Sequence, residues 1–208
     1  MPRSVQESVK GAAVLSTLEF VGAEHGDVEL ARALGSLDPE VRRSMTSCAP
    51  TSELPYEHLS ALWESIDATL HEVAPDWIER SGAHSIQSRG TALYGGILRK
   101  SSPTEFLTQS VSLFRLFYSP GDMVVVEDEP GRAVLRLDGF DGRTRLFCRR
   151  QTGGLGRALE IAGGERPAVS HVRCVNDGDA FCEWELSWLT ISESAKRESP
   201  ARGLRLQP

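Results

Sequence analysis

Apolar residues follow a helical spacing in the first third of the chain and an alternating spacing after Gly121. In the segment 54–73 they recur at intervals of three, four and seven residues, which predicts a helix with one buried face. The residues of this face are Leu59, Leu62, Trp63, Ile66 and Leu70. Shorter helices are predicted at 27–35, where Asp27 precedes the apolar positions and Gly35 ends them, and around Pro39, which suits an early helical position.

A second long helix is predicted from Ser102 to about Tyr118. Ser102 is a good N-cap, Pro103 fits the first helical position, and Glu105 completes a capping box. The segment has a wide apolar surface, which favours a central helix of the core.

Beyond Gly121 the pattern predicts strands. Residues 122–138 form two alternating runs around a Glu-Pro-Gly turn, and residues 143–151 are predicted as a third strand that ends near Cys148. A short helix at 155–162 and a hairpin at 171–188 follow. The expected class is α+β, with an N-terminal helical layer and a central helix packed on an antiparallel sheet. We expect one domain over 1–190, with a helical part at 1–89, and a flexible tail at 191–208.

Composition narrows the function classes. The chain has 208 residues and a net charge of -6, which argues against general binding to nucleic acid or to anionic membranes. No apolar run is long enough for a membrane span, and the N-terminus has no signal-peptide pattern. We therefore expect a cytoplasmic protein, in which cysteines are reduced thiols or metal ligands.

The clearest chemical signal surrounds the turn sequence NDGD. Cys174 and Cys182 lie four residues to either side of Gly178, so a hairpin centred there places them opposite each other, with Cβ atoms about 5 Å apart. This arrangement suits a shared metal ion, a disulfide, or two thiols of the core. The disulfide is the poorest match to the expected compartment.

Cys148 and His171 are candidates for the other two ligands of a metal ion. Three thiolates and one imidazole form a common closed set for structural zinc. His171 and Cys174 are three residues apart, so in a regular strand they point to opposite faces. A metal site therefore requires a bulge or a bend, for which Val172–Arg173 is the expected place.

The segment from about Gly90 to Thr190 resembles the vinyl-4-reductase domain family, whose fold is shared with heme-NO-binding-like domains and TRAPP subunits. The closest likeness is to the aromatic-sensing input domains of bacterial transcription activators. It rests on Cys148, the glycine-rich GGLGRALEIAGG, and the Cys-x7-Cys pair at 174 and 182. The resemblance implies a structural zinc ion, with His171 in place of the family's glutamate. The whole chain also resembles uncharacterised myxobacterial proteins of similar length.

The same resemblance implies a pocket for a small hydrophobic or aromatic ligand between the sheet and the central helix. By analogy Phe114, Phe117 and Trp184 would line it; the alternative is that these aromatic side chains fill the core.

The chain has no GxSxG or HExxH motif. We expect a non-enzymatic sensor that signals through a partner protein and forms a homodimer. The alternatives are a scaffold subunit with a filled core, and an accessory or reductase role in tetrapyrrole metabolism, which only the family name suggests.

Overall fold

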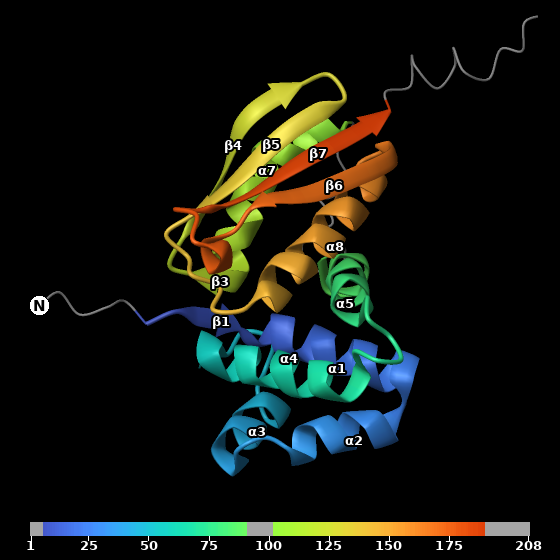
Figure 1. Cartoon of the computed structure of the whole chain (residues 1–208), viewed down its shortest axis with the longest axis vertical. Coiled ribbons are helices and arrows are strands. Elements are labelled where there is room, and N and C mark those ends of the chain that lie inside the picture. The colour runs from blue at the N-terminus through green and yellow to red at the C-terminus, as the bar shows by residue number, and fades with distance from the viewer. Residues whose placement is uncertain (1–5, 91–101, 190–208) are drawn as a thin grey trace, which may run out of the picture.

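The computed structural model describes residues 6–90 and 102–189. Figure 1 shows a layer of helices at one end of the molecule and a twisted sheet at the other, with α5 and α8 between them. The helical layer consists of α1 (Gly11–His25), α2 (Asp27–Gly35), α3 (Pro39–Thr46) and α4 (Tyr56–Leu70). Beside it lies a small antiparallel sheet, in the order β2 (Glu53–Pro55), β1 (Ser8–Lys10), β3 (Tyr118–Ser119).

The helical layer confirms the predicted apolar face. All five predicted residues of α4 are at most 1% exposed, and they pack in one core with the inner faces of α1 and of the sheet. Helix α2 begins at Asp27, and α3 begins at Pro39 with the Asp38 side chain as its N-cap. The short range of these signals explains their success, because capping groups and apolar spacing act within one or two helical turns.

The four-stranded sheet is antiparallel and has the order β4 (Asp122–Glu129), β5 (Arg132–Asp138), β7 (Cys182–Leu189), β6 (Glu165–Arg173). Buried and more exposed side chains alternate along β7. Its core-facing residues are Cys182, Trp184, Leu186 and Trp188. The predicted hairpin at 122–138 and the predicted α+β class are both confirmed.

Helix α7 (Pro103–Phe117) begins where the sequence predicts. The Glu105 backbone N–H donates to Ser102 Oγ at 3.2 Å, which satisfies one of the amide groups that a helix start leaves unpaired. In the described part of the chain, no helix combines the length and the apolar character that crossing a membrane requires.

The predicted strand at 143–151 is wrong, because these residues start a helix. Helix α8 (Arg145–Ile161) opens with Thr144 as N-cap, whose Oγ1 accepts from the Leu146 backbone N–H at 3.3 Å. The first three glycines of the glycine-rich segment, Gly153, Gly154 and Gly156, lie inside α8. Gly153 meets the backbone of α5 (Trp77–Ser85) so closely that a side chain there would overlap it. Tight packing against α5 therefore accounts for a glycine-rich sequence in a helix. Helix α5 runs on into the π-helical turn η1 (Ile86–Gly90).

Candidate metal centre

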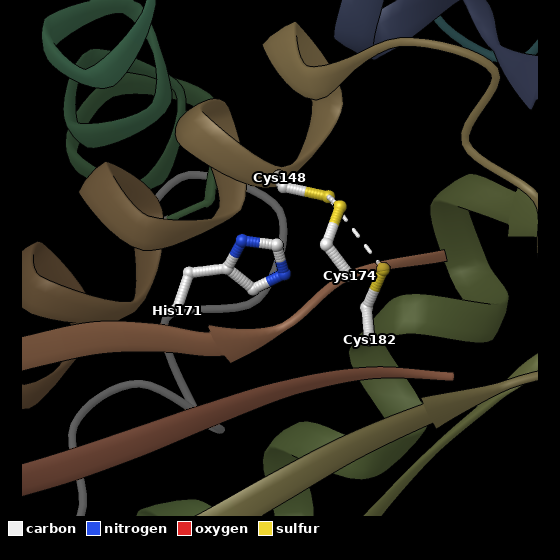
Figure 2. Close-up of side chains that lie close together, drawn as sticks. All are labelled: Cys148, His171, Cys174 and Cys182. Carbon is white, nitrogen blue, oxygen red and sulfur yellow. Dashed lines mark hydrogen bonds between the residues drawn. The ribbon is translucent and has the colours of Figure 1, made fainter. Parts of the chain in front are cut away.

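Four side chains, from α8, β6, β7 and the residue that follows β6, converge on one point beneath the sheet. Their ligand atoms, three sulfurs and one imidazole nitrogen, all lie within 4.8 Å of one another. Figure 2 shows Cys148 reaching down from α8 toward Cys174, Cys182 and the ring of His171. The three cysteines are at most 3% exposed, and His171 is half-buried. The structure thus brings together all four residues that the sequence proposed as ligands.

A bulge in β6 makes this convergence possible. The pairing of β6 with β7 shifts between His171 and Arg173, and Val172 is 44% exposed at the shift. The extra residue allows His171 and Cys174 to reach the same side, as the three-residue spacing requires. The predicted bulge at Val172–Arg173 is therefore confirmed.

The turn between the two cysteines is held by its own polar groups. Gly178 has a φ of 96°, a left-handed conformation that glycine adopts without a steric penalty. The Asp179 carboxylate accepts from the Cys174 backbone N–H at 2.8 Å, and the Cys174 carbonyl accepts from the Asp177 and Asp179 backbone N–H groups at 2.9 and 3.1 Å. These bonds fix the Cys174 backbone, and with it the origin of the side chain.

The sulfur spacing matches that of a metal–thiolate site. Cys148 Sγ lies 3.6 Å from Cys182 Sγ and 3.9 Å from Cys174 Sγ. A tetrahedral ion with metal–sulfur bonds of about 2.3 Å holds its sulfurs about 3.8 Å apart. His171 Nε2 is buried and has no hydrogen-bond partner among the described residues. The spacing of the four donors is therefore compatible with a single ion, which would also supply that nitrogen with a partner.

The electrostatics of the cluster favour one thiolate at neutral pH. The hydrogen bond between the Cys148 and Cys182 sulfurs and, to a lesser extent, the nearby His171 ring lower the pKa of Cys182 to about 5, although burial acts in the opposite direction. The same sulfur–sulfur bond, together with burial, raises the pKa of Cys148. Cys182 is thus the member of this pair that gives up its proton first, and its negative charge attracts a cation.

A second set of contacts orients the ligands. The His171 ring stacks on Trp184, with ring centroids 4.8 Å apart. Trp184 Nε1 donates to Thr152 Oγ1 at 3.1 Å, and Thr152 Oγ1 donates to the Cys148 carbonyl at 3.0 Å. Sequence reasoning missed Thr152, because nothing in the local pattern links it to a residue 32 positions away. By contrast, Asp179 of the NDGD turn could have been predicted to hold the turn, since aspartate side chains in turns often accept from nearby backbone amides.

The three residues expected to line a ligand pocket lie in two different parts of the core. Phe114 is buried among aromatic rings, with its centroid 5.5 Å from that of Phe140. Phe117 is partly buried against the same core. Trp184 is fully buried beside His171. A pocket formed by these three side chains stays a prediction.

Comparisons with known proteins identify the fold. No protein-family model and no curated protein sequence matches the chain. Among solved structures, an unliganded Fe(II) H-NOX protein from K. algicida has a TM-score of 0.67 at 14% identity, over 87% of this chain and 97% of that one. An H-NOX protein from S. oneidensis in the Fe(II)NO state has a TM-score of 0.67 at 16% identity, over 87% and 99% of the two chains. A variant of T. tengcongensis H-NOX has a TM-score of 0.64 at 10% identity, over 87% and 98%. The chain therefore has the H-NOX fold, which confirms the expected heme-NO-binding-like architecture.

The expectation of structural zinc as the cofactor is wrong. Other matching structures come from work on heme distortion in the H-NOX family and on heme redox potential, so the cofactor of these structural neighbours is a heme and not zinc. The zinc assignment rested on cysteine spacing and on the family resemblance. Spacing defines a set of donor atoms but not the metal, because several ions accept thiolate and imidazole ligands.

The described residues of this chain do not fit a heme. Heme iron needs an axial donor that faces a space large enough for the porphyrin. The sequence has no histidine between His84 and His171, so α7, α8, β4 and β5 carry none. His171 faces sulfurs crowded within 4.8 Å, a spacing that suits an ion rather than a macrocycle. Of four cavities lined by described residues, none has a histidine or a cysteine in its wall.

Proposed function

We propose that this chain is a non-enzymatic regulatory module that binds a small molecule and signals through a partner chain. In this proposal Cys148, His171, Cys174 and Cys182 hold one metal ion. The observation that carries it is the convergence of four ligand atoms within 4.8 Å, on a fold whose solved examples include an H-NOX protein in an Fe(II)NO state. The ion belongs to the class that prefers sulfur and nitrogen donors.

The role of the ion in this proposal is to clamp the sheet to α8. Cys148 lies in the first turn of α8, Cys174 follows β6, and Cys182 begins β7. Four protein ligands leave a tetrahedral ion no open position for water or substrate, which suits a structural or signalling role and not hydrolysis. Because the four ligand atoms come together only when α8 packs beneath β6 and β7, the bound ion stabilises the folded chain over the unfolded one.

The likeness to the vinyl-4-reductase domain family is a finer part of the same proposal. It rests on the layout of Cys148, the glycine-rich segment and the pair at 174 and 182. In the structure, residues 153–161 of the glycine-rich segment belong to α8. Phe114, Phe117 and Trp184 are the residues proposed to contact an aromatic ligand, and a homodimer is the proposed assembly.

Metal content tests the metal-centre part of the proposal. We expect about one metal ion per folded chain by elemental mass spectrometry of protein purified without chelator. Cobalt(II) added to the metal-free protein should give the ligand-field bands of a tetrahedral thiolate site. Cys174→Ser should lose both signals. Cys48→Ser is the matched control, because Cys48 lies outside the cluster, and it should keep both.

Two outcomes would contradict a metal centre. One is a wild-type protein that holds no metal and binds no cobalt. The other is cobalt binding that Cys174→Ser and Cys48→Ser reduce equally. In either case the three thiols are core residues, which behave as small apolar groups, and the scaffold alternative gains weight.

A further inference from the structure

Arg150 places a positive charge inside the protein without a negative partner among residues 6–90 and 102–189. It is 6% exposed and lies on α8, where the helix faces α1 and α4. Its guanidinium donates from Nη1 to the Tyr118 hydroxyl at 3.3 Å and from Nη2 to Ser16 Oγ at 3.2 Å. Its Nε is buried and has no hydrogen-bond partner among the described residues. Both known acceptors are neutral, so the charge itself is not compensated.

No carboxylate in the described part of the chain is paired with Arg150. Arg150 makes no ion pair with any carboxylate in residues 6–90 and 102–189, whereas the neighbouring Arg149 is paired with Glu79 at 2.6 Å. Burial raises the pKa of Tyr118, although Arg150 acts in the opposite direction, so that phenol stays neutral near pH 7. Outside the described residues the only acidic side chains are Glu193 and Glu198.

A buried guanidinium without a counterion is costly. Burying an isolated charge is strongly unfavourable, and arginine cannot relieve the cost by losing its proton. Buried charges in proteins are accordingly paired with an opposite charge or coordinated. The Trp63 ring, 5.4 Å from Arg150 Cζ, offers only the weak attraction of an aromatic face.

We propose that Arg150 is the anchoring residue of a ligand site that takes an organic carboxylate with an apolar body. A carboxylate can accept from Nε–H and a neighbouring Nη–H in the paired geometry that guanidinium favours. One guanidinium compensates one negative charge, which suits a carboxylate better than a doubly charged phosphate. The buried aromatic side chains of Trp63 and Tyr118 suit an apolar skeleton. This proposal names the ligand class of the module and rests on the function proposed above.

The test compares thermal unfolding of the full chain with benzoate, with hexanoate, with the neutral amides benzamide and hexanamide, and with inorganic phosphate. At about ten times its Kd, a carboxylate that binds only the folded state should raise the wild-type Tm by about 3–6 °C. The amides and phosphate should raise it by much less. Arg150→Gln should remove the response to carboxylate, and Arg150→Lys should keep part of it. Arg149→Gln should respond as wild type does, because Arg149 is outside the proposed site and already paired.

A second readout removes dependence on the choice of probe. Without any carboxylate, Arg150→Gln should unfold at a temperature equal to or above that of wild type, because the substitution removes an uncompensated charge. A clear fall in the Tm of Arg150→Gln, with no wild-type response to either carboxylate, would overturn the proposal. So would a double variant, Glu193→Gln with Glu198→Gln, that gains a carboxylate response absent from wild type, since the tail would then be the counterion.

The possible outcomes distinguish a failure of the carboxylate site from a failure of the small-molecule-binding or metal-binding function proposed above. If benzamide stabilises wild type as much as benzoate does, the chain binds small molecules but Arg150 does not select an anion, and only the present proposal fails. If benzoate stabilises the protein while metal and cobalt are absent, the carboxylate site stands and the metal centre fails.

Discussion

The tight crossing of α5 and α8 makes Gly153→Ala a sharp prediction. An added Cβ at Gly153 would lie 2.6 Å from the carbonyl carbon of Glu79 and 2.7 Å from its Cα, and would also overlap the Glu79 carbonyl oxygen. These are backbone atoms of α5, so no side-chain rotation can relieve the overlap. The two helices would have to separate by roughly 1 Å, against the dense packing of a protein interior.

Two effects compete, and their magnitudes decide the sign. Alanine stabilises a helix interior by about 1 kcal/mol relative to glycine. Overpacking at a site that cannot relax costs about 1–3 kcal/mol, and backbone overlap belongs at or above the upper end. We therefore expect Gly153→Ala to lower the free energy of unfolding by about 2 kcal/mol or more.

Gly156→Ala is the matched control, because it makes the same change three residues further along α8. Its added Cβ would meet only a Val169 methyl group, at an ordinary 3.9 Å. Helix propensity should dominate there, so this variant should gain up to about 1 kcal/mol. Urea denaturation of both variants, in the presence of chelator, measures the two free energies. Equal effects at Gly153 and Gly156 would refute the close approach of α5 and α8.

Three further predictions concern the site and its supports. The pKa of Cys182 is about 5 in the folded chain and ordinarily 9.0, so between these pH values the unfolded chain binds a proton that the folded chain does not. The urea midpoint of the metal-free protein should therefore rise as the pH is raised from 5 to 9, and this stabilisation should be lost as the pH falls through 5. The midpoint of Cys182→Ser should change far less over the same range. Ser102→Ala should cost about 1 kcal/mol in urea denaturation through loss of the α7 cap, and no measurable loss would contradict the capping bond. Trp184→Phe should cost about 1–2 kcal/mol, because Thr152 loses its indole donor; unchanged stability would show that this bond contributes little.

The sequence predicted what depends on local signals. Ser102 was predicted to start a helix because its side chain can bond an amide within the next turn, and the apolar face of α4 is visible as a regular interval in the sequence. The bulge at Val172–Arg173 was predictable for another reason. Residues three apart in a regular strand point to opposite faces, so His171 and Cys174 can share a site only if the strand contains an extra residue, a β-bulge, between them.

The predicted strand that ends near Cys148 was wrong because of packing between segments that are distant in the sequence. Residues 143–151 were predicted as a strand, with a helix only from residue 155, yet α8 runs from Arg145 to Ile161. Its glycines are needed for the approach of α5, a contact between residues more than 70 positions apart that no window of sequence contains. Cys148 still reaches the other cysteines, because a helix that crosses beneath the sheet can present one side chain to it, as a strand end would.

Helix α8 connects the two proposed sites. Cys148 and Arg150 are two residues apart, so on a helix they point in nearly opposite directions. Cys148 faces the ends of β6 and β7, whereas Arg150 faces Ser16 of α1 and the Trp63 ring of α4. Because α8 packs tightly against α5, a ligand bound at Arg150 would act on the same helix that carries Cys148. Any such coupling must be reciprocal, because each site changes the binding free energy of the other by the same amount. The arrangement thus offers a direct physical route by which an anion bound between the helices would alter the metal centre beneath the sheet.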